Sequence, residues 1–255
     1  MNAIEFNNVV KKFDNGVLAL DGLTLAVPAG TIFGFLGLNG AGKTTSIRIL
    51  AGLDRQDSGT VNILGKTMQE HGYTIKCRLG FVLDQPVYFD WMTPREYLEF
   101  IGTMYGLDSA QIKSRTGELI EFFDLTDDED RTINTFSTGM KKKTSLAAAI
   151  IHVPSLLILD EPLEGIDAVV AASIKETLRV LASRGTTVFI TSHVMETVEQ
   201  LCSEIAIINN GRVVLQCPTS GIRQISGKEY AGLEDLFIDV VSERVRKKTL
   251  PYLQQ

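Results

Sequence analysis

Residues Gly37 to Thr44 have the composition of a phosphate-binding loop. They read Gly-Leu-Asn-Gly-Ala-Gly-Lys-Thr and fit the pattern G-x-x-x-x-G-K-[ST], between an apolar run and a segment with a helical apolar face. Glycines let backbone amides approach phosphate oxygens, Lys43 neutralises the β- and γ-oxygens, and the Thr44 hydroxyl serves a magnesium ion. We therefore expect ATP or a similar triphosphate to bind here. The residues of this expected site are Gly37, Leu38, Asn39, Gly40, Ala41, Gly42, Lys43, Thr44 and Thr45.

Two adjacent carboxylates, Asp160 and Glu161, follow the apolar run Leu156 to Leu159. Successive side chains of a strand point in opposite directions, so the two carboxylates can do different work. Phosphoryl transfer to water needs a metal ion and a positioned base. We assign Asp160 to the magnesium shell and Glu161 to orienting and deprotonating the attacking water. Taken alone, such a pair is as often an ordinary helix cap.

Three apolar runs without alternation indicate parallel strands that are covered on both faces. Each run ends in a polar cluster, namely the phosphate loop, the acidic pair, and Ser192-His193. Ligands of open α/β sheets bind beyond the carboxyl ends of the strands, so the three clusters should converge. The three runs are Thr31 to Leu36, Leu156 to Leu159, and Thr187 to Ile190.

Two β-hairpins are indicated by glycine-containing turns between apolar segments. The first joins Ile4 to Phe13 with Val17 to Val27, whose alternating residues predict an antiparallel, half-exposed sheet. The second joins Ile205 to Ile208 with Arg212 to Leu215 through Asn210-Gly211. A short helix is expected later, around Leu233 to Val241.

A helical insertion is predicted between the first two central strands. It opens at Thr93-Pro94-Arg95-Glu96, a capping box with proline at the first helical position. Tyr97, Ile101 and Met104 should form the apolar face of that helix. A second helix should begin near Gly139 and end before Pro154, and the acidic patch before it, Asp127 to Asp130, is interpreted as solvated loop.

These segments predict an α/β fold. We expect a P-loop NTPase core with a mainly parallel central sheet, an N-terminal antiparallel β-subdomain and an inserted α-helical subdomain at about residues 86–153. One ATPase domain should cover residues 1–220, and a C-terminal helical tail should cover residues 221–255. No segment of the sequence has the length and apolarity of a bilayer span, and no leader is expected at the N-terminus.

Composition argues against nucleic acid as a partner and against an oxidising compartment. The 255 residues carry a net charge of -6 with a pI near 5.2, which works against direct binding of nucleic acid. Cys77, Cys202 and Cys217 lack Cys-x-x-Cys spacing, which fits free thiols in a reducing compartment.

The sequence Phe136-Ser-Thr-Gly-Met-Lys-Lys142 resembles the signature of the ATP-binding cassette (ABC) transporter ATPases, and it stands shortly before the acidic pair. The resemblance extends from about Ile4 to Leu215. It implies that Ser137, Thr138 and Gly139 contact the γ-phosphate of ATP held by an opposite subunit. A head-to-tail dimer, with a second copy of this chain as the simplest partner, follows from that resemblance.

The resemblance implies roles for further residues. Phe13 should stack on adenine, Asp167 in Gly165-Ile166-Asp167 should lie in the loop that links the two active sites, and His193 should contact the γ-phosphate. A lone aromatic is more often core and a lone histidine more often incidental. At Asp84-Gln85 the chain departs from the family, because Asp84 rather than Gln85 aligns with the glutamine that senses magnesium and the membrane partner. Aspartate is shorter and cannot donate a hydrogen bond.

Two sequence features leave alternatives open. Lys141, Lys142 and Lys143 crowd a helix N-terminus, where positive charge is unfavourable, so either a bound phosphate compensates them or they extend into water. The apolar cluster after Gln85 either receives a helix of the membrane subunit or belongs to local core. Its members are Val87, Tyr88, Phe89, Trp91 and Met92.

The main hypothesis is an ATP-hydrolysing subunit that works with magnesium, lies peripherally on the cytoplasmic face of the membrane, and powers an integral membrane permease. The signature resembles those of exporters, while the sequence does not identify the transported substrate. One alternative is a soluble ABC-type ATPase that acts on ribosomes or DNA, although there is a single phosphate loop and no long heptad stretch. Another is a regulatory subunit that hydrolyses ATP poorly, motivated by Asp84 and opposed by Glu161 and His193.

Overall fold

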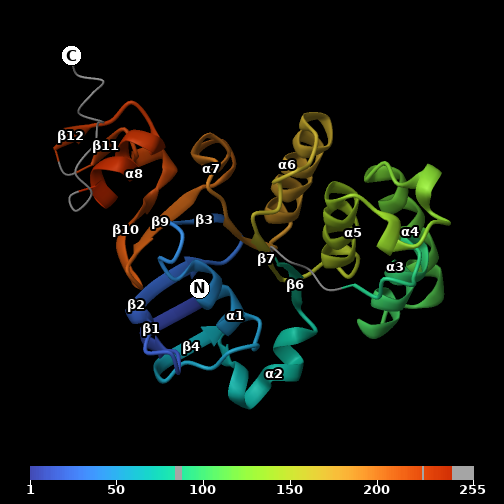
Figure 1. The fold of residues 1–255 in the computed structure, drawn as a ribbon, viewed down its shortest axis with the longest axis horizontal. Coiled ribbons are helices and arrows are strands. Elements are labelled where there is room, and N and C mark those ends of the chain that lie inside the picture. The colour runs from blue at the N-terminus through green and yellow to red at the C-terminus, as the bar shows by residue number, and fades with distance from the viewer. Residues whose placement is uncertain (84–87, 226, 243–255) are drawn as a thin grey trace.

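A central sheet of six strands brings together chain segments that are far apart in sequence (Figure 1). The structure is a computed structural model that describes residues 1–83, 88–225 and 227–242. The strand order is β10-β9-β3-β8-β7-β6, with parallel pairing throughout except for the antiparallel β9 and β10. The strands are β3 (Ile32–Leu36), β6 (Leu79–Val82), β7 (Leu156–Asp160), β8 (Thr187–Thr191), β9 (Glu204–Asn209) and β10 (Arg212–Pro218).

The three strands predicted from apolar runs, β3, β7 and β8, are neighbours in this sheet and every residue in them is buried. Their alternating side chains divide between two hydrophobic cores, as the period of two residues in a strand requires. Leu157 and Leu159 enter the core beneath the helices, whereas Leu156 and Ile158 enter the core shared with the second sheet. Both faces of the central sheet are therefore covered, which confirms that part of the predicted fold.

A second, antiparallel sheet of order β2-β1-β4-β5 packs against one face of the central sheet. The predicted N-terminal hairpin is confirmed, because β1 pairs with β2 in antiparallel register. Strands β4 and β5 were not predicted from sequence, because they are short and partly exposed. The strands are β1 (Asn2–Lys12), β2 (Leu18–Pro28), β4 (Ser58–Ile63) and β5 (Lys66–Thr67).

Three helices lie between β6 and β7 at one end of the molecule (Figure 1). The predicted capping box of the first is present, with the Thr93 hydroxyl accepting from Glu96 N and the Glu96 carboxylate accepting from Thr93 N. The helices are α3 (Pro94–Met104), α4 (Ser109–Phe122) and α5 (Thr138–Ile150), with 3-10 turns at η1 (Thr126–Asp128) and η2 (Ile133–Thr135). The acidic patch is not wholly solvated, because Glu129 pairs with Arg95 and Asp128 pairs with Arg131.

The predicted apolar face of α3 was wrong in one respect. Met104 is 67% exposed, whereas Tyr97 and Ile101 are partly buried and pack against the core as predicted. The fully packed side of the helix carries Leu98 and Gly102 instead. These lie one residue further along than Tyr97 and Ile101, a rotation of about 100° around the helix axis.

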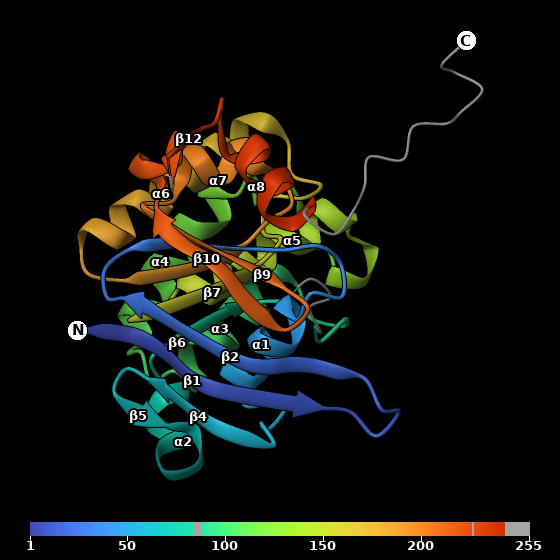
Figure 2. The same ribbon diagram turned by 90° about the vertical axis from the view of Figure 1, so that its left-hand side faces the viewer.

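Other helices flank the central sheet, and the C-terminal elements lie at the opposite end from the antiparallel sheet (Figure 2). Within α8 the expected helix around Leu233 to Val241 is confirmed, as is the hairpin of β9 and β10. None of the helices in the described residues is long and apolar enough to cross a bilayer. These elements are α1 (Lys43–Leu50), α2 (Met68–Lys76), α6 (Ala168–Ser183), α7 (Met195–Leu201), η3 (Thr219–Gly221), β11 (Gln224–Ile225), β12 (Lys228–Glu229) and α8 (Leu233–Ser242).

Candidate nucleotide site

The phosphate loop runs from the end of β3 to the start of α1. Gly42 has φ +113°, and a Cβ atom there would lie 2.8 Å from Ala19 O, so a side chain is excluded on both grounds. Gly42 is also the N-cap residue of α1 and gives the helix no side-chain cap. The first amides of α1 therefore stay available to phosphate oxygens, at the positive end of the helix dipole.

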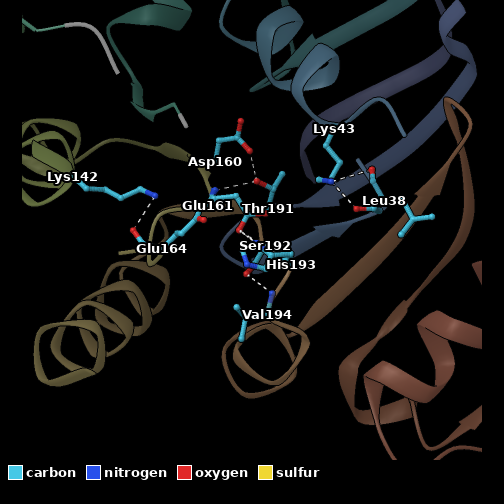
Figure 3. Close-up of polar contacts among 11 residues, drawn as sticks. Leu38, Lys43, Lys142, Asp160, Glu161, Glu164, Thr191, Ser192, His193 and Val194 are labelled. Carbon is cyan, nitrogen blue, oxygen red and sulfur yellow. Dashed lines mark hydrogen bonds and ion pairs between the residues drawn. The ribbon is translucent and has the colours of Figure 1, made fainter. Parts of the chain in front are cut away.

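Lys43 folds over this loop. Its ammonium donates to Gly37 O at 2.6 Å and to Leu38 O at 3.3 Å (Figure 3). Burial lowers the pKa of Lys43, and the negative charges of Glu161 and Asp160 oppose that shift. Because both carboxylates act on Lys43, the phosphate loop and the acidic pair face a common space, and the predicted convergence of these two clusters is present.

Asp160 is the last residue of β7 and is 5% exposed. It lies opposite Thr191, the last residue of β8, in the parallel register. The Thr191 hydroxyl donates to Asp160 Oδ1, and it also accepts from Glu161 N at 3.2 Å. Thr191 is fully buried. Through these two hydrogen bonds it links Asp160 with the backbone of Glu161. Sequence motifs gave Thr191 no role, because its contacts follow from the register between β7 and β8.

Glu161 leaves β7 with a backbone conformation that is unusual for a residue with a side chain. Its φ is +47°, in the left-handed region. Its amide donates to Thr191 O at 3.2 Å, and its carboxylate Oε2 accepts from His193 N at 3.2 Å. His193 Nδ1 lies 3.0 Å from the same Oε2 (Figure 3). The third polar cluster, at the end of β8, therefore also reaches the acidic pair.

The oxygen donors at this edge fit a magnesium ion. Magnesium is a hard cation that prefers carboxylate and hydroxyl oxygens together with substrate phosphates. The Asp160 carboxylate lies at the sheet edge near Lys43, and Thr44 is an exposed residue in the first turn of α1. Among the described residues, no group of three or more His, Cys, Asp or Glu side chains could hold a metal.

The signature residues form the N-terminus of α5. The Ser137 side chain caps the helix by accepting from Met140 N at 3.3 Å, and Ser137 and Thr138 are both exposed. A Cβ atom on Gly139 would lie 2.8 Å from Gly165 O, so the helix start packs directly on the loop that follows Glu161. Figure 1 shows α5 beside α3 and away from α1, so this helix does not approach the phosphate loop of its own chain.

The lysines that follow the signature do not all extend into water, which corrects the alternative that all three are solvated. Lys142 is only 6% exposed, and its ammonium donates to Glu164 O at 3.2 Å (Figure 3). Lys143 lies 3.5 Å from Asp167 Oδ2. The fold has brought these cations against the loop between Glu161 and α6, which offers a carbonyl and a carboxylate as acceptors.

Asp167 is the N-cap residue of α6. Its carboxylate accepts from Val170 N at 2.9 Å. That hydrogen bond, followed by the charge of Lys143, lowers the pKa of Asp167. The residue proposed from sequence as a link between sites is therefore joined within this chain to the signature helix.

The other residues singled out from sequence have mixed outcomes. Phe13 lies half-buried in the turn between β1 and β2, with Lys11 Nζ 5.6 Å from its ring centroid. Its stacking on adenine stays a prediction. Asp84 and Gln85 lie outside the described residues, as does Val87. All three cysteines are free, as expected.

The aromatic cluster is partly local packing, and its role as a receiver of a membrane-subunit helix stays a prediction. Tyr88 belongs to local packing, because its hydroxyl donates to Lys141 O and accepts from Ser145, each at 2.7 Å. Burial is the main cause that raises the pKa of Tyr88 to about 12. By contrast, Trp91 is 70% exposed and lies 5.3 Å from Phe89, centroid to centroid.

Comparison with known proteins decides the family. The model of the ABC transporter family matches residues 20–164, more than half of the chain. The chain belongs to this family. Membership makes it an ATPase subunit of a transporter, which confirms that part of the main hypothesis from sequence.

Several characterised relatives are similar over most of this chain. The daunorubicin/doxorubicin resistance ATP-binding protein DrrA of Streptomyces peucetius is 38% identical over 91% of this chain and 70% of its own length. The linearmycin resistance ATP-binding protein LnrL of Bacillus subtilis is 37% identical over 83% of this chain and 68% of its own. The Nod factor export ATP-binding protein I of Ralstonia nicotianae is 38% identical over 77% of this chain and 61% of its own length.

Solved structures agree on the fold. The ATP-binding subunit of an ABC transporter superposes with a TM-score of 0.88 at 27% identity, covering 93% of this chain and 99% of that one. The cassette MJ0796, solved as a dimer bound to ADP and Pi, has a TM-score of 0.78 at 22% identity, over 85% of this chain and 98% of that one. The fold class predicted from sequence is thereby confirmed.

Proposed function

We propose that this chain hydrolyses ATP to drive an exporter, with two cassettes closing head to tail on two ATP molecules and a separate integral membrane permease receiving the motion. The contact of Glu161 with His193 carries the hydrolytic part of the proposal. A carboxylate fixed at the end of a buried strand, beside a phosphate loop, is placed as the base that hydrolysis requires.

The residues divide the reaction as follows. The amides at the start of α1 and the Lys43 ammonium hold the phosphate oxygens. Glu161 orients a water molecule and accepts its proton while the water oxygen bonds to the γ-phosphorus and ADP leaves. The backbone amide of His193 donates to the Glu161 carboxylate and, with the nearby ring nitrogen Nδ1, holds it in position. Thr44 and Asp160 would hold magnesium, which when bound supplies positive charge to the phosphate oxygens.

Dimerisation is supported by the position of the signature residues. Ser137 and Thr138 are exposed at the N-terminus of α5, yet this helix lies away from α1 of the same chain (Figure 1). Their resemblance to a γ-phosphate-binding signature is therefore satisfied best by ATP on a second copy of the chain. Lys143 and Asp167 then connect the two sites within each subunit.

An aromatic surface group supports the permease partner, and the names of relatives support the direction of transport. Phe89, Trp91 and Phe100 form an aromatic group, with Phe89 5.3 Å from each of the other ring centroids. Exposed aromatic rings are typical anchors of protein interfaces, so we assign this group to a helix of the permease on the cytoplasmic side. Resistance and export appear in the names of the relatives, which supports the export direction.

Replacement of Glu161 by Gln tests hydrolysis. We expect the steady-state ATPase rate to fall by at least about 100-fold, because the amide keeps the size of the side chain but cannot accept a proton. ATP should still bind, so Glu161→Gln should accumulate as an ATP-bound dimer in size-exclusion chromatography. Glu164→Gln, in the same loop, is the matched control and should keep its activity.

Equal rates for Glu161→Gln and the wild type would remove Glu161 from the role of base. A wild type that binds ATP without hydrolysing it would favour the regulatory alternative instead. Copurification with a membrane protein from detergent extracts supports the permease, whereas recovery with ribosomes alone would contradict the transporter assignment.

A further inference from the structure

Thr191 contacts the carboxylate of Asp160 and the backbone amide of Glu161. It lies at the end of β8, between β3, which leads to the phosphate loop, and β7, which ends in Asp160. Its side chain is fully buried. We propose that the Thr191 hydroxyl is a positioning group that sets the magnesium-facing carboxylate and the catalytic carboxylate in one fixed arrangement. This inference rests on the proposed function.

A hydroxyl offers one donor and two acceptor positions, and Thr191 uses both kinds at this site. It donates to Asp160 Oδ1 and accepts from Glu161 N at 3.2 Å. The donated bond fixes one oxygen of the Asp160 carboxylate and thus the direction of the other. The terminal torsion of a carboxylate is intrinsically broad, so a hydrogen bond to one of its oxygens narrows it.

The accepted bond acts on the backbone of Glu161. Its φ of +47° is a conformation that a side chain makes unfavourable, and it persists only where neighbours hold it. Both Thr191 Oγ1 and Thr191 O accept from Glu161 N, each at 3.2 Å. The turn directs the Glu161 carboxylate toward His193, only two residues after Thr191. One threonine therefore influences Asp160, Glu161 and His193 together.

Packing alone does not account for these contacts. A valine has the shape of threonine and suits a buried strand equally well, but lacks both hydrogen bonds. Thr187, at the other end of β8, is also buried, and its hydroxyl accepts from Gly30 N at 2.9 Å. Thr187 thus offers a matched control in which valine removes a buried hydroxyl of the same strand away from the acidic pair.

The experiment compares Thr191→Val, Thr191→Ser and Thr187→Val. Binding of Mn²⁺ in the presence of AMP-PNP is followed by EPR, and steady-state ATPase rates are measured over a range of Mg²⁺ concentrations. For Thr191→Val we expect the half-saturating metal concentration to rise and kcat to fall, each by roughly tenfold, as for the loss of a hydrogen bond to a charged group. ADP binding in EDTA should be unchanged.

Thr191→Ser should restore both values to within about twofold of the wild type, because serine keeps the hydroxyl. Thr187→Val should leave them unchanged even where its melting temperature falls. The proposal is overturned if Thr191→Val keeps the wild-type metal affinity and kcat, or if Thr191→Ser is impaired equally. Should valine prevent folding, Thr191→Ala takes its place against Thr191→Ser. A wild type without ATPase activity would refute the proposed function, while the Mn²⁺ measurement would still test Thr191.

Discussion

Lys142 shows at the scale of one residue how position can outweigh residue type. Burying an ammonium is costly unless hydrogen bonds replace the lost water. At 6% exposure Lys142 donates to Glu164 O, three residues beyond the base Glu161. This hydrogen bond connects the signature helix α5 to the loop that follows Glu161. We interpret it as a contact that couples movements of α5 and the loop, rather than as one that only stabilises the fold.

Lys142→Met tests that interpretation, because methionine keeps much of the side-chain length without the charge. We expect the free energy of unfolding to change by less than about 1 kcal/mol, since the lost hydrogen bond is offset by the removal of a buried charge. The ATPase rate should nevertheless fall by about fivefold, through weaker coupling of α5 to the loop. Urea unfolding and steady-state kinetics measure the two effects.

Lys141→Met is the matched control for that variant. Lys141 is less buried, and its contact with Tyr88 is made by the backbone carbonyl, which the substitution leaves in place. Its rate should stay close to that of the wild type. A Lys142→Met protein that hydrolyses ATP at the wild-type rate would show that the buried lysine serves packing only.

At the scale of elements, the sequence predicted those helices and strands that depend on local residue patterns. The uninterrupted apolar runs identified β3, β7 and β8, and the Thr93 capping box located the start of α3. The exposure of Met104 and the burial of Lys142 were missed, because both depend on which side of a helix meets its neighbours. For the candidate site, motif spacing indicated Lys43, Asp160, Glu161 and His193. Thr191 could not be found, because its role comes from cross-strand register.

The joint between the inserted helices and the central sheet is an example of such tertiary contacts. Tyr105, the C-cap of α3, and His152, which follows α5, stack with ring centroids 3.5 Å apart. Both bind one carbonyl of β6, since Tyr105 Oη donates to Leu79 O at 2.9 Å and His152 Nε2 lies 3.0 Å from it. The buried His152 Nδ1 has no hydrogen-bond partner among the described residues, which fits a neutral ring.

Acid should weaken this joint. Burial is the main cause that lowers the pKa of His152 from its usual value of 6.5 to about 4. Between these values the unfolded chain binds a proton that the folded chain does not, so stability falls as the pH falls from about 6.5 toward 4. From pH 7.5 to pH 5 this histidine should cost about 2 kcal/mol. Urea unfolding at the two pH values measures the loss.

His152→Phe keeps an aromatic ring beside Tyr105 but cannot titrate, so its loss of stability over the same pH range should be smaller by about 2 kcal/mol. The exposed His71 supplies the control, and His71→Gln should behave as the wild type does. Equal pH dependence in His152→Phe and the wild type would show that His152 does not control the acid response.

At the scale of the whole molecule, the phosphate loop and the signature lie on different parts of one chain. Figure 3 shows Lys142 of α5 and Lys43 of α1 on opposite sides of Glu161. A head-to-tail pair would bring the loop of one copy to the signature of the other, twice, through one two-fold axis. Each composite site would then need Lys43 from one subunit and Ser137 from its partner, which makes the arrangement testable by complementation.

Lys43→Ala and Ser137→Asp would each inactivate a homodimer at both sites. The aspartate keeps the helix N-cap of α5 but places a negative charge near the γ-phosphate, while Ser137→Asn is a control that keeps the cap without the charge. A mixed dimer contains one site with both defects and one site with neither. If subunits exchange freely, half of the dimers are mixed, so an equal mixture should recover about a quarter of the wild-type ATPase rate. If the mixture stays as inactive as the separate variants while exchange is verified by differently tagged subunits, each site is built within one chain and the head-to-tail dimer is wrong.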